Sequence, residues 1–590
     1  MHKAHDTGHN SAPMAPHSDP YAEALQFARG SKFQDAAAAI DRFLAQSPSS
    51  ADGLTLAASI RLALGQAAEA LVASDAAIAI MPGLPRAHAA RADALQALKR
   101  FEDAVASYDR AIALKPDQVS ALTNRGNTLA ELDRSEEALA SYSLALAMAP
   151  DAPQIHSNRA RVLNELQRFD EAIESADRAI SLNPNYANAW MHRGKAFYGL
   201  LRFPEALECF FAAARIDGRS GEVLTNLGMG LAAVGRYAES LTALDLAVAL
   251  SSAPSPARFQ RARVRLMLGE FGSGWDDYEA RWDDRVFVAT GSGCVTEEGR
   301  RHMSPPAAAD DIAGARLLLL SEQGVGEEIM FASMLPDVLG LAASATLVCD
   351  PRLTSLFAES FPALTVMGRD AARTLRLGDF DRITPMGSLC RAMRRNAAAF
   401  PGAPYLAPRR DLVARWGERL GPANGRMRVG ISWRGGTQKT GGAARSMSLA
   451  QLKPLLDVDG CDFVSLQYGD PRDEIAAANR ELGQAIKVFP AVEIDDFEEL
   501  AALTMALDHV VTIQTALVHL CGAVGQKAIV MVPKRPEWRY MASGPSMPWY
   551  GSVQIIRQTQ QEDWNGVIAQ TAEALAERRR AAISQTIDRS

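Results

Sequence analysis

Proline recurs every 34 residues along the N-terminal half of this 590-residue chain. The series runs through Pro48, Pro82, Pro116, Pro150 and Pro184, and Gly218 and Ser252 continue it in the same phase. Because proline lacks an N–H and clashes with the preceding turn, each of these positions predicts the end of a helix. A fixed period of this length indicates stacked structural repeats, which bury their apolar faces against their neighbours.

Two rows of small residues keep the same period and predict pairs of closely packed helices. The first row is Ala36, Ala70, Ala104, Ala138, Ala172, Ala206 and Ser240, and the second is Ala24, Ala58, Ala92, Gly126, Ala160, Gly194 and Gly228. Small side chains at these points let the two helices of a hairpin lie close together. The spacing resembles the tetratricopeptide repeat over about residues 21–268, and the resemblance implies a superhelix whose groove binds an extended peptide or a partner helix.

A row of polar residues stands two positions before the second small row. It consists of Asn124, Asn158, His192, Asn226 and Gln260. Amides at regular intervals can hydrogen-bond a peptide backbone without requiring a particular side chain. The row resembles the asparagine ladder of O-GlcNAc transferases, so we expect it to bind an acceptor polypeptide. The alternative is that these are ordinary polar residues of the helices.

The segments on either side of the repeats have a different composition. Residues 1–20 are rich in His, Pro and Ser and are expected to form a disordered tail. Residues 269–312 are expected to form a capping helix and a linker. Trp275, Tyr278 and Trp282 recur there at helical spacing, which favours a buried stripe that covers the last repeat and docks the next domain.

Unbroken apolar runs begin at residue 315 and alternate with turns and helices. The runs lie at about 315–320, 345–350, 428–433, 462–467, 509–514 and 527–533. Strand, turn and helix repeated in this way predict an α/β fold with parallel sheets. We expect two Rossmann-like lobes, residues 313–410 and 427–590, joined by residues 411–426. Ligands of such sheets bind at the carboxyl ends of the strands.

The turn after the first run carries candidate residues for binding and catalysis. Gly324 and Gly326 let backbone amides approach an anion or a sugar closely. The turn lacks the third glycine of a dinucleotide-binding fingerprint, and no GKS or GKT follows it. Glu327 at the start of the next helix is a candidate general base. The alternative is that this carboxylate only favours the positive end of the helix dipole.

Turns of the second lobe carry groups suited to a nucleotide phosphate. The candidates are Trp433, Arg434, Lys439 and Arg445 in a glycine-rich loop, Gln467 and Tyr468 after the next run, and Gln514, Thr515, Ala516 and His519 at a helix start. Cations and free amides in one loop bind phosphate oxygens, and a helix N-terminus does the same. The alternatives are a surface loop without a ligand and a structural histidine.

The quoted motifs together resemble one family of enzymes. The segments are SEQGVGEE, GISWRGG, SLQYGD, QTALVHLCGAVG, PEWRYM and MPWYGSVQIIRQ. They look like bacterial glycosyltransferases in which tetratricopeptide repeats precede a heptosyltransferase-like GT-B domain, and are most similar to flagellin-modifying transferases of alphaproteobacteria. That family normally has Asp where this chain has Glu327 and where it has Gln514.

The resemblance implies an inverting, metal-independent protein O-glycosyltransferase. Glu327 would accept the hydroxyl proton, while Arg434, Lys439, Arg445, Thr515 and His519 would offset charge on the departing phosphate. The implied partners are a nucleotide sugar, CMP- or UDP-linked and including nonulosonic acids such as pseudaminic acid, and an acceptor protein such as flagellin. Two alternatives are a non-catalytic scaffold or flagellin chaperone, and a transferase acting on lipopolysaccharide sugar.

Charge and cysteine content restrict the class of protein. A net charge of −7 gives no reason to expect nucleic-acid binding, and no stretch approaches 18 apolar residues, so no membrane insertion is expected. Six cysteines without CxxC spacing argue against a zinc cluster and against a disulfide framework. No cofactor is expected, and the expected location is the cytoplasm.

Overall fold

The computed structural model describes residues 19–283, 287–288, 296–435, 445–483, 485–490, 495–560 and 563–587. The chain divides into two compact units, residues 1–230 and 231–590. Of the predicted tail, residues 1–20, only residues 19 and 20 are among the described residues.

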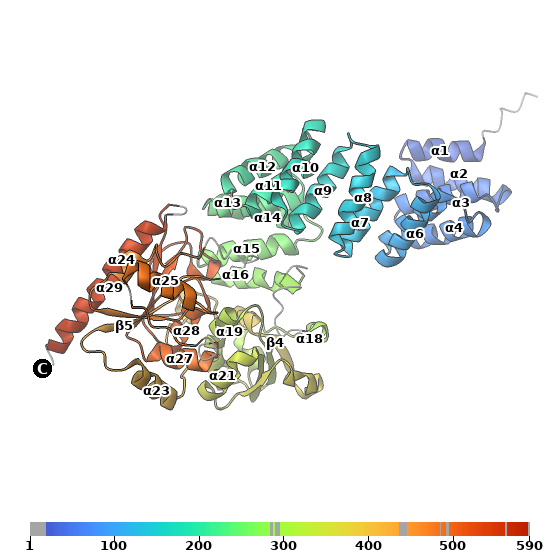
Figure 1. The fold of residues 1–590 in the computed structure, drawn as a ribbon. Helices are drawn as coiled ribbons and strands as arrows, with labels where there is room; N and C mark the ends of the chain where they lie inside the picture. Colours follow the sequence, from blue (N-terminus) through green and yellow to red (C-terminus); the bar gives the residue numbers. More distant parts are fainter. Residues whose placement is uncertain are drawn as a thin grey trace, which may run out of the picture. The chain divides into compact units, whose positions relative to one another are not determined.

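The first unit is an all-helical superhelix of repeated helix pairs (Figure 1). The pairs are α1 (Pro20–Arg29) with α2 (Phe33–Gln46), α3 (Ala51–Ala63) with α4 (Ala67–Ile80), α5 (Pro85–Ala97) with α6 (Phe101–Leu114), α7 (Val119–Glu131) with α8 (Ser135–Met148), α9 (Pro153–Glu165) with α10 (Phe169–Leu182), and α11 (Ala187–Gly199) with α12 (Phe203–Ile216), and α13 (Gly221–Ala233) follows at the unit boundary. The predicted helix ends are confirmed, since α4 ends just before Pro82 and α8 just before Pro150.

Local sterics explain why the period is so regular. Helix pairs turn through a residue with positive φ at each repeat, and these residues are Ser31, Gly65, Lys99, Asp133, Gln167, Leu201, Gly235 and Gly269. The small rows permit the predicted close packing. A Cβ on Gly126 would lie 2.6 Å from Cε1 of Tyr142 in the partner helix, and one on Gly194 would lie 2.6 Å from Cε1 of Phe210.

The second unit begins with helices that continue the repeat phase. They are α14 (Tyr237–Leu250), α15 (Ser255–Met267) and α16 (Phe271–Tyr278), followed by the 3-10 helix η1 (Glu279–Asp283) and the short helix α18 (Glu297–Arg301). The unit boundary thus lies inside the predicted repeat range 21–268. The buried stripe is confirmed for Trp275 and Tyr278, which are 0% and 1% exposed. Trp275 Nε1 also donates a 2.9 Å hydrogen bond to the carbonyl oxygen of Arg394 in the first lobe.

Two parallel sheets form the rest of the second unit. The first has the order β3-β2-β1-β4, with β1 (Arg316–Leu320), β2 (Ser344–Cys349), β3 (Thr365–Gly368) and β4 (Arg382–Pro385). The second has the order β6-β5-β7-β8-β9, with β5 (Met427–Ile431), β6 (Cys461–Ser465), β7 (His509–Ile513), β8 (Ala528–Val532) and β9 (Val553–Arg557). In the registers, Leu318 pairs with Thr346 and Val429 with Phe463. The six predicted runs are confirmed as β1, β2, β5, β6, β7 and β8, whereas β3, β4 and β9 were missed.

Helices cover both sheets and join them. The first lobe has α19 (Val325–Phe331), α20 (Leu335–Leu341), α21 (Thr354–Ser360) and α22 (Leu389–Met393). The second has α23 (Arg410–Leu420), α24 (Lys453–Leu456), α25 (Arg472–Leu482), α27 (Phe497–Met505), α28 (Ala516–Val524) and α29 (Trp564–Ile587), which is red in Figure 1. Among the described helices none is long and apolar enough to cross a membrane.

The two lobes meet through α19 and α28. A Cβ on Gly326 in α19 would lie 3.3 Å from Cα of Ala516 in α28, so glycine permits this approach. One apolar core runs through both lobes and includes Leu319 of β1 and Val510 of β7. The backbone N–H groups of Tyr405 and Leu406, in the segment before α23, both donate to the carbonyl oxygen of Ala523 in α28. The two lobes are therefore packed directly against each other.

Candidate functional site

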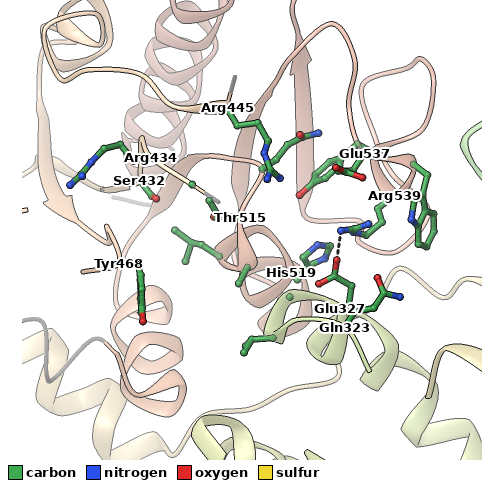
Figure 2. A pocket seen from close by; sticks show the side chains of 18 of the residues that line it. Gln323, Glu327, Ser432, Arg434, Arg445, Tyr468, Thr515, His519, Glu537 and Arg539 are labelled. Carbon is green, nitrogen blue, oxygen red and sulfur yellow. Dashed lines mark hydrogen bonds and ion pairs between the residues drawn. The ribbon is translucent and has the colours of Figure 1, made fainter. Parts of the chain in front are cut away.

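A cavity of about 1010 Å³ lies where the carboxyl ends of β1, β2, β5, β6 and β7 meet. Ten of the predicted site residues line it. They are Gly326, Glu327, Arg434, Arg445, Gln467, Tyr468, Gln514, Thr515, Ala516 and His519. Figure 2 shows Arg434, Thr515 and Tyr468 on one side of the cavity and Gln323, Glu327 and Arg539 on the other.

Two predicted residues have other positions, and a third is not described. Gly324 caps the N-terminus of α19 beside the cavity but does not line it. The indole of Trp433 is fully buried and donates from Nε1 to Oε1 of Glu474 at 2.8 Å, so it belongs to the core of the second lobe. Lys439 lies outside the described residues.

Glu327 forms an ion pair with Arg539 across the cavity wall, as the dashed line in Figure 2 shows. Both side chains are largely shielded from solvent, at 15% and 14% exposed. The pair joins the start of α19 in the first lobe to η11 (Trp538–Tyr540), which follows β8 in the second. The pair holds the carboxylate of Glu327 at the interface between the lobes. Sequence reasoning missed Arg539.

His519 is buried in α28, and its ring contacts the hydroxyl group of a tyrosine. Nδ1 of His519 lies 3.1 Å from the hydroxyl of Tyr550, and the hydroxyl of Tyr405 donates to the carbonyl oxygen of Ile329 at 2.7 Å. Burial and the nearby charge of Arg539 lower the pKa of His519 to about 3. The ring is therefore neutral near pH 7. It can hydrogen-bond a ligand, but it does not supply the positive charge that the sequence led us to expect.

The two candidate glutamines have different environments. Oε1 of Gln467 accepts from the N–H groups of Trp433 and Arg434 at 3.0 and 2.8 Å, and its Nε2 donates to the carbonyl oxygen of Arg434 at 2.9 Å. Gln467 therefore holds the loop after β5. Gln514 is 3% exposed, and neither Oε1 nor Nε2 of its side chain has a hydrogen-bond partner among the described residues. A buried amide without partners is costly, which makes it a candidate contact for a ligand.

Thr515 and Ala516 place the N-terminus of α28 at the cavity beside Gln514. Thr515 is the N-cap of this nine-residue helix, and its side chain makes no capping hydrogen bond. A Cβ on Gly435 would lie 2.4 Å from Cγ2 of Thr515, so glycine is required where the loop after β5 crosses this turn. The first N–H groups of a helix and its dipole favour an anion.

The cavity wall carries more positive than negative groups. The cations are Arg263, Arg352, Arg434, Arg445 and Arg539, and the carboxylates are Glu327 and Glu537. Behind the wall, Asp350 pairs with Arg352 at 3.0 Å and Glu474 pairs with Arg434 at 3.0 Å. Burial raises the pKa of Glu537, but Arg539, Arg263 and Arg445 together outweigh it and hold that pKa below its ordinary value. The groups that a ligand would touch therefore suit an anion.

Aromatic rings form the wall next to Glu327. They include Phe259 of α15, Tyr278 of α16, Phe287 and Trp538. Phe259 lies 5.8 Å from Tyr278 and 5.7 Å from Phe287 between ring centroids, and Tyr278 lies 6.0 Å from Trp538. The sequence led us to expect Tyr278 only in the core. Trp538 and Arg539 belong to the segment PEWRYM, which contributed to the resemblance but was given no role.

The predicted acceptor-binding amides make contacts within the helix array. Nδ2 of Asn124 donates to Asp93 and Nδ2 of Asn158 to Asn127, each at 3.0 Å and each in the preceding repeat. Nδ2 of Asn226 donates to the carbonyl oxygen of Glu222 at 2.9 Å. Burial lowers the pKa of His192 to about 3. Each of these asparagines therefore uses one amide N–H for a hydrogen bond within the helix array.

Metal ligands were not predicted. Across the described ranges, no group of three or more His, Cys, Asp or Glu side chains lies together in a way that could hold a metal ion.

Models of the tetratricopeptide repeat match four segments of the chain, residues 21–85, 92–133, 119–152 and 160–200. Protein FlbA of Caulobacter vibrioides is 32% identical over 358 residues, and this match covers 56% of the chain and 57% of FlbA. The chain therefore spans little more than half the length of that relative.

Solved structures of repeat proteins are also similar. A thermophilic tetratricopeptide-repeat protein of Thermus thermophilus shares 24% identity, covers 30% of this chain and 97% of its own, and has a TM-score of 0.28. A repeat protein from Parabacteroides merdae shares 15% identity, with 41% and 96% coverage and a TM-score of 0.36. The N-terminal half of the chain thus consists of tetratricopeptide repeats, and the chain is similar to FlbA.

Proposed function

We propose that this protein is an O-glycosyltransferase, which moves a sugar from a nucleotide to a serine or threonine hydroxyl of an acceptor protein. The observation that carries the proposal is the cavity of about 1010 Å³ at the facing ends of two parallel sheets. It combines a carboxylate, several guanidinium groups and an unpaired buried amide. The resemblance of the motifs to GT-B glycosyltransferases supplies the class of reaction.

In the proposed reaction the acceptor hydroxyl oxygen attacks the anomeric carbon of the sugar. The new bond forms as the bond from that carbon to the phosphate oxygen breaks, and the nucleotide leaves with the electron pair. The hydroxyl proton goes to the carboxylate of Glu327, which lies in the cavity wall. Direct displacement inverts the configuration at the anomeric carbon.

The nucleotide phosphate has a suitable site at the second sheet. Arg434 and Arg445 lie there with the N-terminus of α28, where Thr515 begins the helix. Guanidinium groups and helix N–H groups placed before the reaction stabilise negative charge as it develops on the leaving group. CMP- and UDP-linked sugars, nonulosonic acids included, fit this chemistry.

The repeats are proposed to hold the acceptor, for which flagellin is the candidate by resemblance. Asn124 and Asn158 each use one amide N–H within the array. An amide has two N–H donors and a carbonyl acceptor, so each retains groups that can bond a polypeptide main chain.

The test is transfer by the full chain to co-expressed, unmodified flagellin, followed by intact mass. We expect a fixed sugar increment with the wild type. Glu327→Gln should lower the rate by about 10²- to 10⁴-fold, the contribution of a positioned base. Glutamine can still accept a hydrogen bond from Arg539, so affinity for the nucleotide should be kept. Glu359→Gln, an exposed site on α21, is the matched control. Full activity of Glu327→Gln would remove Glu327 as the base.

One observation favours a non-catalytic scaffold as the second candidate. The carboxylate of Glu327 is already paired with Arg539, so an acceptor hydroxyl has to share the carboxylate with Arg539 or displace it. A scaffold would bind flagellin without any mass increment from either CMP- or UDP-linked donors, and that result would displace the transferase proposal.

A further inference from the structure

The cavity has two ends of different chemistry. The end formed by the turns after β5, β6 and β7 carries Arg434, Thr515 and the unpaired amide of Gln514. The other end carries Phe259, Tyr278 and Trp538 and lies next to Glu327. The first end suits a nucleotide phosphate, as argued above. At the second end the guanidinium groups of Arg263 and Arg539 are paired with Glu537 and Glu327.

Gln323 and Arg539 connect the aromatic end to the proposed base, Glu327. Nε2 of Gln323, four residues before Glu327, donates to the hydroxyl of Tyr278. The guanidinium of Arg539, the partner of Glu327, lies 5.4 Å from the ring centroid of Trp538. A hydroxyl that gives its proton to Glu327 must come within hydrogen-bond reach of it. The chain that bears this hydroxyl then lies against the aromatic rings.

Helix α15 supplies this wall and also continues the repeat phase. Arg263 of α15 lines the cavity, lies 3.8 Å from Glu537, and donates from its guanidinium to Oε1 of Gln260 at 3.3 Å. Gln260 is the last member of the periodic row of polar residues. One helix therefore carries both the end of that row and two side chains of the cavity, Phe259 and Arg263.

The position of α15 is fixed by a buried carboxylate. Asp277 of α16 is 4% exposed and accepts from Arg261 at 2.6 Å and from Arg265 at 2.8 Å. The backbone N–H of Ala542 donates to the carbonyl oxygen of Met267 at the end of α15. These contacts pack the C-terminal half of α15 against α16 and against the segment that follows η11.

We infer that Phe259 and Arg263 form an acceptor subsite, which binds the polypeptide segment next to the modified serine or threonine. The inference rests on the proposed function. Phe259 and Trp538 pack against the acceptor's aliphatic groups, and Arg263 donates to its main-chain carbonyl oxygens. The occupant is an extended segment of acceptor polypeptide, and the competing occupant is the nucleobase of the donor, which would stack on the same rings.

The test uses the full chain with Phe259→Ala, Arg263→Ala and the control Arg480→Ala, an exposed arginine of α25. Acceptor KM for unmodified flagellin should rise by about tenfold or more in the first two variants, as for other well-packed contact residues. Affinity for CMP and UDP by titration, and hydrolysis of the donor without acceptor, should match the wild type. Arg480→Ala should change nothing.

Other results overturn the inference. A loss of CMP or UDP affinity in Phe259→Ala assigns the aromatic end to the nucleobase, and unchanged acceptor KM removes the subsite. Phe259→Leu and Arg263→Lys replace any variant that does not fold. If the wild type neither transfers nor hydrolyses, the proposed function fails, and direct titration of flagellin into wild type and variants still decides whether α15 contacts the acceptor.

Discussion

Replacing Arg281 with methionine should destabilise the second unit more than the loss of any exposed charge. Arg281 and Glu322 are both 0% exposed, and Arg281 Nε lies 2.8 Å from Glu322 Oε2. All five N–H groups of the guanidinium are used, with Glu322, Ser388, Tyr278 and Glu279 as acceptors. The arginine thereby joins η1 to the end of β1, beside Gln323 in the cavity wall.

The size of the effect follows from what the variant leaves behind. Without Arg281, the carboxylate of Glu322 still accepts from the N–H of Gly387 at 2.7 Å but loses the cation that pairs with it. Breaking a buried ion pair by removing one partner costs about 3–5 kcal/mol. Methionine fills much of the volume of the arginine stem. The measured loss of stability should therefore come from the unpaired charge of Glu322 more than from a cavity. The contact of the guanidinium with the rings of Tyr278 and Trp282 is also lost.

The loss of stability in Arg281→Met should increase as the pH rises. Burial raises the pKa of Glu322, and Arg281 opposes that rise. Without Arg281 the folded-state pKa rises further above the unfolded value, so the folded state binds the proton more tightly. Stability is then lost as pH increases from the ordinary glutamate range towards the raised value. The variant should approach the wild type at about pH 5 and differ most at about pH 8.

Urea unfolding followed by tryptophan fluorescence is the assay, because seven of the eight tryptophans, all except Trp190, lie beyond residue 230. Arg281→Met combined with Glu322→Leu removes both charges and should recover most of the loss, since an apolar pair replaces an ion pair at little cost. Arg301→Met breaks an exposed pair, 73% and 70% exposed, and should leave the midpoint unchanged. A single variant within about 1 kcal/mol of wild type at pH 8 would refute the reasoning.

Two further predictions concern the helix pairs. Gly126→Leu should destabilise the chain by about 1–3 kcal/mol through overpacking, because the added Cβ would lie 2.6 Å from the ring of Tyr142. Gly235→Ala should destabilise by about 1 kcal/mol through its φ of +80° alone, as nothing lies within 4 Å of the new Cβ. Gly83→Ala has open space and no positive φ, so it should be neutral or slightly stabilising. Unfolding by circular dichroism measures all three, and an equal effect of the three substitutions would contradict both explanations.

The repeats were predictable because their determinants are local. Proline, the small rows and the turn positions act within one or two neighbouring helices, so a fixed period in the sequence is a fixed period in space. The six buried strands were predictable for the same reason, as unbroken apolar runs. β3, β4 and β9 were missed; all three lie at sheet edges, and β4 also contains Pro385. Such strands lack the long apolar run of a central strand.

The site was only half predictable because its parts are distant in the chain. Residues after β1, β5, β6 and β7 could be found from the rule that ligands bind at the carboxyl ends of parallel strands. Arg352 follows β2 and obeys the same rule, so it could have been found. Arg539 could not, since its partner Glu327 is 212 residues away and the segment that holds it has no glycine turn. Phe259 and Arg263 lie inside the predicted repeat range 21–268, and no role was predicted for either.

The sequence alone could not predict that Gln467 and Gln514 have different hydrogen-bonding environments. Gln467 is the second residue after the edge strand β6 and Gln514 the first after the central strand β7, and each was expected to contact the donor. Two main-chain N–H groups of the loop after β5 donate to the side-chain carbonyl oxygen of Gln467. The amide of Gln467 therefore stabilises this loop. Within the described part of the chain no main-chain group bonds the side chain of Gln514, and both of its polar atoms are buried there without partners. Since an unpaired buried amide costs about 1–3 kcal/mol, a ligand that bonds Gln514 regains free energy that a ligand at Gln467 would not. Of the two glutamines, Gln514 is therefore the one expected to contact the donor.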